Sequence, residues 1–128
     1  MQFEKHFSVS EASQLLVQIR PKVEEIARLK AILDTKGYDV QKHRYFGGMG
    51  PNGQKVFPNE MEELVAYVTE LNKLGVQVKD LGAGLIDFPH ERKSGEEVLL
   101  CFKLPETELS FWHSLDGGFA GRRPLSEL

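Results

Sequence analysis

The sequence predicts an α+β fold in which a long antiparallel helical hairpin packs on a small antiparallel β-meander of about four strands. Before residue 76, apolar residues recur at steps of three and four, as in amphipathic helices, and after it the period changes to two. The chain has 128 residues, of which 41% are hydrophobic and 27% charged, an ordinary balance for one globular domain. We therefore expect a single domain over residues 1–128, with the hairpin at 8–75, the meander at 76–114 and a C-terminal loop at 115–128.

The first helix is expected to begin after Ser8 and to run to about Lys36. Ser8 is followed three residues later by Glu11, which is the spacing of a capping box. Pro21 lies inside the helix and removes one backbone donor, so we expect a kink there. One apolar stripe follows the helical period and predicts the buried face: Ala12, Leu16, Ile19, Val23, Ile26 and Leu33, widened by Leu15 and Leu29.

A second helix is expected between Asn59 and Gly75. Asn59 is a typical N-cap residue, Glu62 completes a capping box, and Gly75 favours the end of the helix. Its expected buried face comprises Met61, Leu64, Val65, Val68 and Leu71. We interpret the stripes of both helices as core and mutual contact rather than as a ligand site.

The segment between the helices, residues 37–58, holds five glycines and two prolines in 22 residues. Segments of this length without regular structure are usually functional or disordered. One interpretation is a mobile hairpin, and the other is a basic and aromatic lid over an anionic ligand. The residues of that lid would be Lys42, His43, Arg44, Tyr45, Phe46 and Lys55.

Four short runs after Gly75 have the alternation of strands, and turn residues separate them. They are VQVKDL at 76–81, LIDF at 85–88, EVLLCFKL at 97–104 and ELSFWH at 108–113. The assumed register pairs Leu81 with Leu85, Lys79 with Asp87, Phe88 with Glu97, Leu104 with Leu109, and Leu100 with His113. It places one apolar face on the sheet: Leu85, Asp87, Val98, Leu100, Phe102, Leu104, Leu109, Phe111 and His113.

This register has consequences for the polar side chains. Asp87 and His113 share the apolar face but lie two strand spacings apart, roughly 10 Å, so we expect them to line one pocket without bonding directly. Cys101 falls on the opposite face, beside Trp112. We therefore expect Cys101 to be a packed apolar residue and not a nucleophile.

Polar residues gather near the end of the chain, in SFWHSLDGGFAGRRPL at 110–125. With Asp87 they define the candidate ligand pocket: Asp87, His113, Asp116, Arg122 and Arg123. One hypothesis is a divalent metal such as zinc or iron, held by Asp87, His113 and Asp116, because imidazole and carboxylates are ordinary ligands of these ions.

Two other interpretations of this cluster stay open. Arg122 and Arg123 would bind a small anion, with backbone amides of the neighbouring glycines approaching it. Alternatively the cluster is a structural latch, in which Lys79 pairs with Asp87 and an arginine bonds Asp116 or a strand-end carbonyl, so that the C-terminal segment is held on the sheet.

Charge and cysteine content exclude several classes of protein. Sixteen basic against 19 acidic residues leave a formal net charge of −3, so we expect no nucleic-acid partner. The one cysteine excludes an intramolecular disulfide and a cysteine-cluster zinc site. The start of the chain lacks the apolar region of a signal peptide, and no uncharged apolar run approaches the roughly 18 residues of a membrane span. We expect no membrane partner and a cytoplasmic location.

The residues quoted above do not identify an activity. We expect a noncatalytic binding or interaction module that forms a homodimer, because a first helix of about 28 residues would span roughly 42 Å, more than a small sheet covers. The alternative is a metal-dependent hydrolase or lyase acting on a small anionic substrate, with the loop at 37–58 closing over it.

Three stretches resemble a known family: FSVSEASQLL, LGVQVKDLGAGLIDF, and VLLCFKL followed by SFWHSLDGGFAGRRPL. They are similar to the uncharacterised prokaryotic family called domain of unknown function 2203. The resemblance covers the first helix and nearly everything after residue 73, and it implies a small cytosolic protein with a helical hairpin and a small sheet. It implies no catalytic residues.

Overall fold

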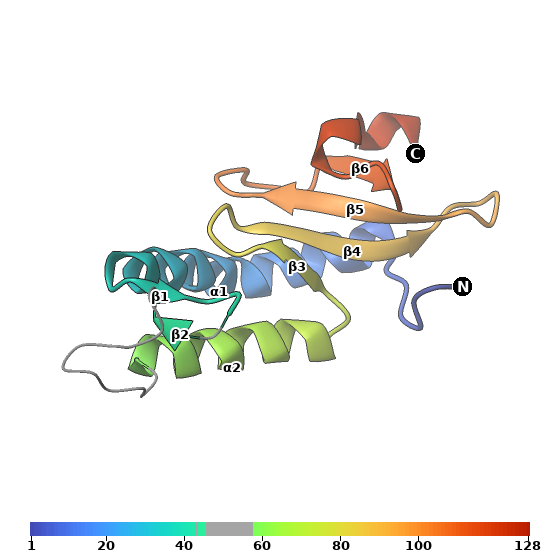
Figure 1. Cartoon of the computed structure of the whole chain (residues 1–128). Coiled ribbons are helices and arrows are strands. Elements are labelled where there is room, and N and C mark those ends of the chain that lie inside the picture. Colours follow the sequence, from blue (N-terminus) through green and yellow to red (C-terminus); the bar gives the residue numbers. More distant parts are fainter. Residues whose placement is uncertain (43, 46–57) are drawn as a thin grey trace.

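Two helices and a five-stranded antiparallel sheet make up the computed structural model, which describes residues 1–42, 44–45 and 58–128. Helix α1, Val9–Thr35, crosses behind the sheet in Figure 1, and helix α2, Asn59–Lys73, lies beside α1. This architecture confirms the expected α+β class. The proposed lid residues His43, Phe46 and Lys55 lie outside the described residues, as do the side chains of Arg44 and Tyr45.

Helix α1 begins with the expected capping box. Ser8 Oγ accepts a hydrogen bond from the Glu11 amide at 3.0 Å, and the Glu11 carboxylate accepts one from the Ser8 amide at 2.9 Å. Pro21 is accommodated within the helix. The stripe is buried as expected, with exposures of at most 3%: Ala12, Leu16, Ile19, Val23, Ile26, Leu29 and Leu33.

Because one chain buries seven of the eight predicted positions, the reason for expecting a second copy does not hold. The stripe packs in a common core with α2 and with side chains of the sheet. Only Leu15 is half-buried, although the helix extends past the sheet in Figure 1. Self-association stays a prediction without this support.

Ion pairs between the helices confirm that they run antiparallel. Lys22, in the middle of α1, pairs with Glu70 near the end of α2, whereas Lys36, just after α1, pairs with Glu60 at the start of α2. Such exposed pairs contribute little stability, so burial of the apolar faces holds the hairpin together.

Helix α2 departs from the prediction at its start and on one face. Its N-cap is Pro58, without a side-chain cap bond, so the predicted Asn59 cap and its capping box are wrong; Asn59 is already helical. Met61, Leu64 and Leu71 are buried, but Val65 is 47% exposed. Val65 follows Leu64 by about 100° around the helix, which turns it out of the stripe.

The predicted meander is confirmed and is extended by one edge strand. The strands β3 Gln77–Asp80, β4 Leu85–Glu91, β5 Glu97–Lys103, β6 Phe111–Ser114 and β7 Arg123–Pro124 lie in the order β3-β4-β5-β6-β7. β7 arises from the segment expected to be a loop, beside the short 3-10 turns Phe119–Gly121 and Leu125–Glu127. A separate two-stranded ladder joins β1, Tyr38–Asp39, to β2, Arg44–Tyr45.

The assumed register is wrong in all three hairpins. Gln77 rather than Lys79 pairs with Asp87, Leu100 rather than Glu97 pairs with Phe88, and Leu99 rather than Leu100 pairs with His113. The causes are an irregularity between Val78 and Asp80, a β4 strand that continues to Glu91 before turning, and a β5–β6 connection that is not a tight turn.

The pairing of β4 with β5 differs from the expectation by three residues, and that of β5 with β6 differs by one. A slip by an odd number of residues exchanges the two faces of a strand. β5 is therefore turned over relative to the expectation. Its residues Val98, Leu100 and Phe102 join Ile86, Phe88 and Trp112 in the core with the helices. Cys101 and Leu99 point to the other face, together with Asp87 and His113.

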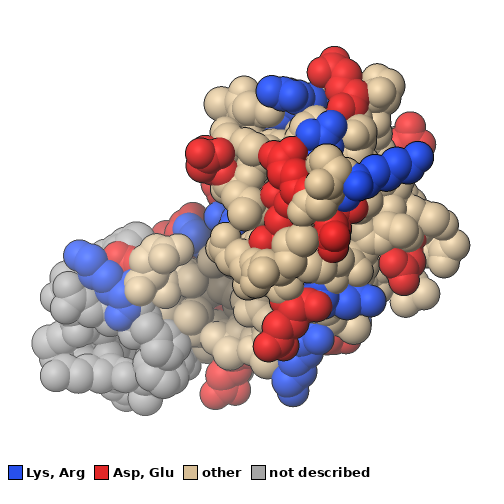
Figure 2. Space-filling model, turned by 90° about the vertical axis from the view of Figure 1, so that its right-hand side faces the viewer, with Lys and Arg blue, Asp and Glu red and all other residues tan. Residues whose placement is uncertain are grey.

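The outer surface carries charges of both signs. Figure 2 shows acidic and basic side chains interspersed over the end of the molecule that is turned to the viewer, with no broad region of one sign on that face. Neither described helix has the length and apolar character needed to cross a membrane.

Candidate metal centre

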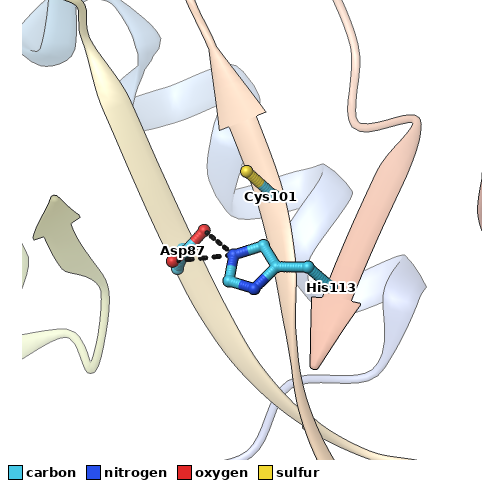
Figure 3. Close-up of side chains that lie close together, drawn as sticks. All are labelled: Asp87, Cys101 and His113. Carbon is cyan, nitrogen blue, oxygen red and sulfur yellow. Dashed lines mark hydrogen bonds and ion pairs between the residues drawn. The ribbon is translucent and has the colours of Figure 1, made fainter. Parts of the chain in front are cut away.

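Three strands bring one aspartate, one cysteine and one histidine together on the sheet face that points away from the helices. Asp87 of β4 and Cys101 of β5 are direct cross-strand partners. His113 of β6 pairs with Leu99, two residues along β5 from Cys101. Figure 3 shows the His113 ring reaching across β5 toward Asp87, with the Cys101 side chain beside them.

The imidazole ring of His113 spans the distance that we expected to separate the two side chains on β4 and β6. His113 Nε2 lies 3.2 Å from Oδ1 and 3.2 Å from Oδ2 of Asp87. The prediction that these two residues do not bond directly is therefore wrong, because a histidine side chain laid along the sheet spans much of two strand spacings. Both residues are buried, with exposures of 1% for Asp87 and 3% for His113.

Hydrogen bonds assign a proton to each ring nitrogen of His113. Nδ1 lies 2.7 Å from the carbonyl oxygen of Ser114, which only accepts, so Nδ1 donates. Nε2 donates in turn to the Asp87 carboxylate. This bond to Asp87 raises the pKa of His113, and burial opposes the rise. The raised pKa favours the protonated ring, which donates from both nitrogens when no metal is bound.

Cys101 lies on the same face as this pair, contrary to the prediction. It is fully buried. Burial, and after it the negative charge of Asp87, raise the pKa of the Cys101 thiol to about 12. The thiol is therefore neutral near pH 7 and is not an activated nucleophile, as the sequence had suggested for a different reason.

Asp116 does not join Asp87 and His113. Its side chain is exposed and accepts a hydrogen bond from Ser114 Oγ at 3.1 Å. Among the described residues, the group of potential metal ligands is Asp87, Cys101 and His113, whose ligand atoms all lie within 4.8 Å of one another. The structure thus places Cys101 where the sequence suggested Asp116.

Arg122 lies next to this group but already has an anionic partner. Its Nη2 donates to both carboxylate oxygens of Glu106, at 2.9 and 2.8 Å, and to the carbonyl oxygen of Cys101 at 3.3 Å. The guanidinium also makes cation–π contacts, 4.0 Å from the ring centroid of Phe111 and 4.7 Å from that of Phe119. Arg122 therefore ties the C-terminal segment to β5, but through Glu106 and a carbonyl within the strand rather than through Asp116 or a strand-end carbonyl as the latch interpretation expected.

Arg123 points elsewhere. Its side chain is exposed and lies 5.3 Å from the centroid of the Trp112 ring, on the helix-facing side of the sheet. The two arginines therefore do not face one anion pocket. The other expected latch contact also differs, because Asp87 forms its ion pair with His113, and its cross-strand partner is Gln77 rather than Lys79.

The sequence contained a signal for Cys101 that our register did not use. The run LIDFPHE continues the strand through Pro89, and SG in RKSGE marks the turn that follows. Folding the hairpin at that turn places Cys101 opposite Asp87. The alternation of EVLLCFK then puts Cys101 on the same face as the carboxylate.

The donor set fits a transition-metal ion. Thiolate sulfur, imidazole nitrogen and carboxylate oxygen are the usual ligands of zinc, and around a tetrahedral zinc ion they lie about 3.3–3.6 Å from one another. The distance of 3.2 Å between His113 Nε2 and the Asp87 oxygens is close to this spacing. Metal-binding histidines typically donate their second ring nitrogen to a carbonyl, as Nδ1 of His113 does to Ser114.

A comparison with protein families matches residues 5–125 to the family described as "Uncharacterized conserved protein (DUF2203)". The match spans both helices and the whole sheet. No curated protein and no solved structure matches the chain.

Proposed function

Because the chain belongs to this family, whose description carries no activity, we propose from the geometry that the protein is a noncatalytic module that holds one divalent transition-metal ion. Asp87, Cys101 and His113 are its ligands. The observation that carries the proposal is the meeting of three ligand atoms of different chemistry within 4.8 Å of one another on a buried sheet face.

A purely structural ion pair is the simpler alternative. Buried ion pairs are often no better for stability than apolar residues of the same size. In such a pair the neutral Cys101 thiol would serve only as a weak hydrogen-bond donor to the Asp87 carboxylate. A metal ion gives all three side chains a role, because it takes the place of the protons on sulfur and on Nε2.

Asp87, Cys101 and His113 can each offer one ligand atom, three in all, so the fourth position of a tetrahedral ion is left to another donor such as water. The three side chains are at most 3% exposed. This burial favours the noncatalytic role over the hydrolase or lyase alternative, which needs a substrate path to the ion.

The ligand types favour particular ions. Thiolate and imidazole together suit zinc or iron, whereas magnesium and calcium prefer shells made of oxygen atoms. A thiolate ligand also requires a reduced cysteine. We therefore assign the protein to the cytoplasm, where thiols are kept reduced.

Elemental analysis of the purified, untagged protein tests the proposal. We expect about one zinc or iron ion per chain, and its loss in Cys101→Ala and in His113→Ala. Alanine in place of Cys101 keeps the position small and apolar, so this variant is expected to stay folded. Far-ultraviolet circular dichroism and thermal unfolding check the fold of each variant.

Asp116→Ala is the matched control, because it removes a carboxylate three residues from His113 that lies outside the cluster. It is expected to keep the full metal content. Wild-type protein that stays metal-free after incubation with zinc and with ferrous iron would contradict the proposal. Loss of metal in Asp116→Ala but not in Cys101→Ala would instead support the ligand set suggested by the sequence.

A further inference from the structure

The start of the chain lies on the same sheet face as the candidate metal centre. Glu97, Leu99 and Cys101 alternate along β5, so their side chains share one face. The Glu97 carboxylate accepts hydrogen bonds from the amides of Gln2 and Phe3, at 2.8 and 2.9 Å. We call residues 2–6 the N-terminal strap.

One carboxylate holds this strap. Besides the two amide bonds, Glu97 Oε2 lies 2.6 Å from Nε2 of His6, and the Glu97 side chain is only 6% exposed. Phe7, the next residue, is anchored independently. Its amide donates to the Pro89 carbonyl at 2.7 Å, and its own carbonyl accepts from His90 Nδ1 at 2.7 Å.

A hollow of about 630 Å³ lies between the strap and the junction of α2 with β3. Residues 2–5 line one side and residues 72–77 the other, and Pro89 also contributes to the lining. Two of the lining residues adjoin Asp87, because Gln77 is its cross-strand partner and Pro89 follows it by two positions on the same face of β4. The hollow therefore reaches the immediate neighbours of a proposed ligand.

The three proposed ligands are at most 3% exposed, so an ion reaches them only if a covering segment moves. Segments held by few hydrogen bonds open at a lower free-energy cost than paired strands. We propose that the N-terminal strap gates the exchange of the metal ion through this hollow, and that Glu97 holds the strap in the closed position. This inference rests on the proposed function.

The rate of zinc release into an excess of a chromogenic chelator tests the gate. Glu97→Gln removes the negative charge and one of the two accepting oxygens. We expect this variant to hold one zinc ion per chain and to release it at least tenfold faster than the wild type. Glu91→Gln is the matched control, because Glu91 is the direct cross-strand partner of Glu97, and is exposed. It is expected to release zinc at the wild-type rate.

His6→Ala is a second variant that leaves Glu97 intact. It removes one of the three groups that donate hydrogen bonds to the Glu97 carboxylate. We expect a release rate between those of the wild type and Glu97→Gln, and this variant decides the matter if Glu97→Gln does not fold. One zinc ion per chain with equal release rates in all variants would overturn the gate and leave the proposed function standing. Wild-type protein that binds no zinc would overturn both.

Discussion

The two ring nitrogens of His113 explain how the candidate centre is held together in the absence of a metal ion. One donates to the Ser114 carbonyl and the other to Asp87, so neither has a free lone pair. A metal ion must displace the proton on Nε2 and the proton on Cys101. Metal binding therefore releases protons, and the apparent affinity rises with pH.

The metal-free protein should lose stability as the pH rises above the ordinary histidine range. The pKa of His113 is raised in the folded state, first by its bond with Asp87, so the pair stabilises the fold fully below the unfolded value, about 6.5. That contribution is lost as the pH rises through the folded value. Denaturant unfolding in the presence of a chelator, between pH 6 and pH 9, measures it.

Asp87→Asn provides the comparison for this pH dependence, because it removes the main cause of the raised pKa while nearly preserving the shape of the side chain. In this variant the free energy of unfolding should depend less on pH over the same range. An unfolding free energy of the wild type that is constant, or that rises with pH, would show that the pair is not ionised as described.

At this scale the sequence allowed part of the centre to be predicted. Asp87 and His113 were expected to line one pocket, because the assumed register placed both side chains on the same face of the sheet. Cys101 was assigned to the wrong face, since the identity of a face changes with a slip of one residue. Chain proximity alone then favoured Asp116 as the third ligand.

At the scale of secondary-structure elements, the helices were predictable and the strand register was not. The stripe of α1 repeats over seven buried positions, so one irregular residue does not obscure it. A strand offers only a few alternations, and its pairing depends on turn geometry and on irregularities such as that between Val78 and Asp80. The two-residue strand β7 has no periodicity that could be detected.

The turn between β3 and β4 should tolerate a side chain at Gly84 poorly. Gly84 has a φ of +64°, and a Cβ atom there would lie 2.5 Å from Leu104 Cδ1. Gly84→Ala therefore combines backbone strain with a steric clash, and we expect a loss of roughly 2–4 kcal/mol in the free energy of unfolding. Chemical denaturation of the purified variant measures this loss.

Gly95→Ala is the control for this substitution. Gly95, in the turn between β4 and β5, has a φ of +93°, but a Cβ atom there would meet nothing within 4 Å. Its replacement by alanine should lower the free energy of unfolding by about 1–2 kcal/mol, through the strained backbone conformation alone. Equal losses in the two variants would show that the contact between Gly84 and Leu104 does not constrain the turn.

At the scale of the whole molecule, the sheet separates two environments. One face completes an apolar core with both helices, and the other carries Asp87, Cys101 and His113. Segments distant in sequence therefore meet around the centre, with residues 2–6 bound at Glu97 and Arg122 bound at the Cys101 carbonyl. The family match over residues 5–125 includes both helices and the whole sheet.

X-ray absorption at the zinc edge of the metal-loaded protein tests the central claim most directly, because the chain contains a single cysteine. We predict one sulfur neighbour at about 2.3 Å and nitrogen or oxygen neighbours at about 2.0–2.2 Å. The sulfur signal should disappear in Cys101→Ala. A zinc ion surrounded only by nitrogen and oxygen in the wild type would contradict the assignment of Cys101 as a ligand, and with it the proposed centre.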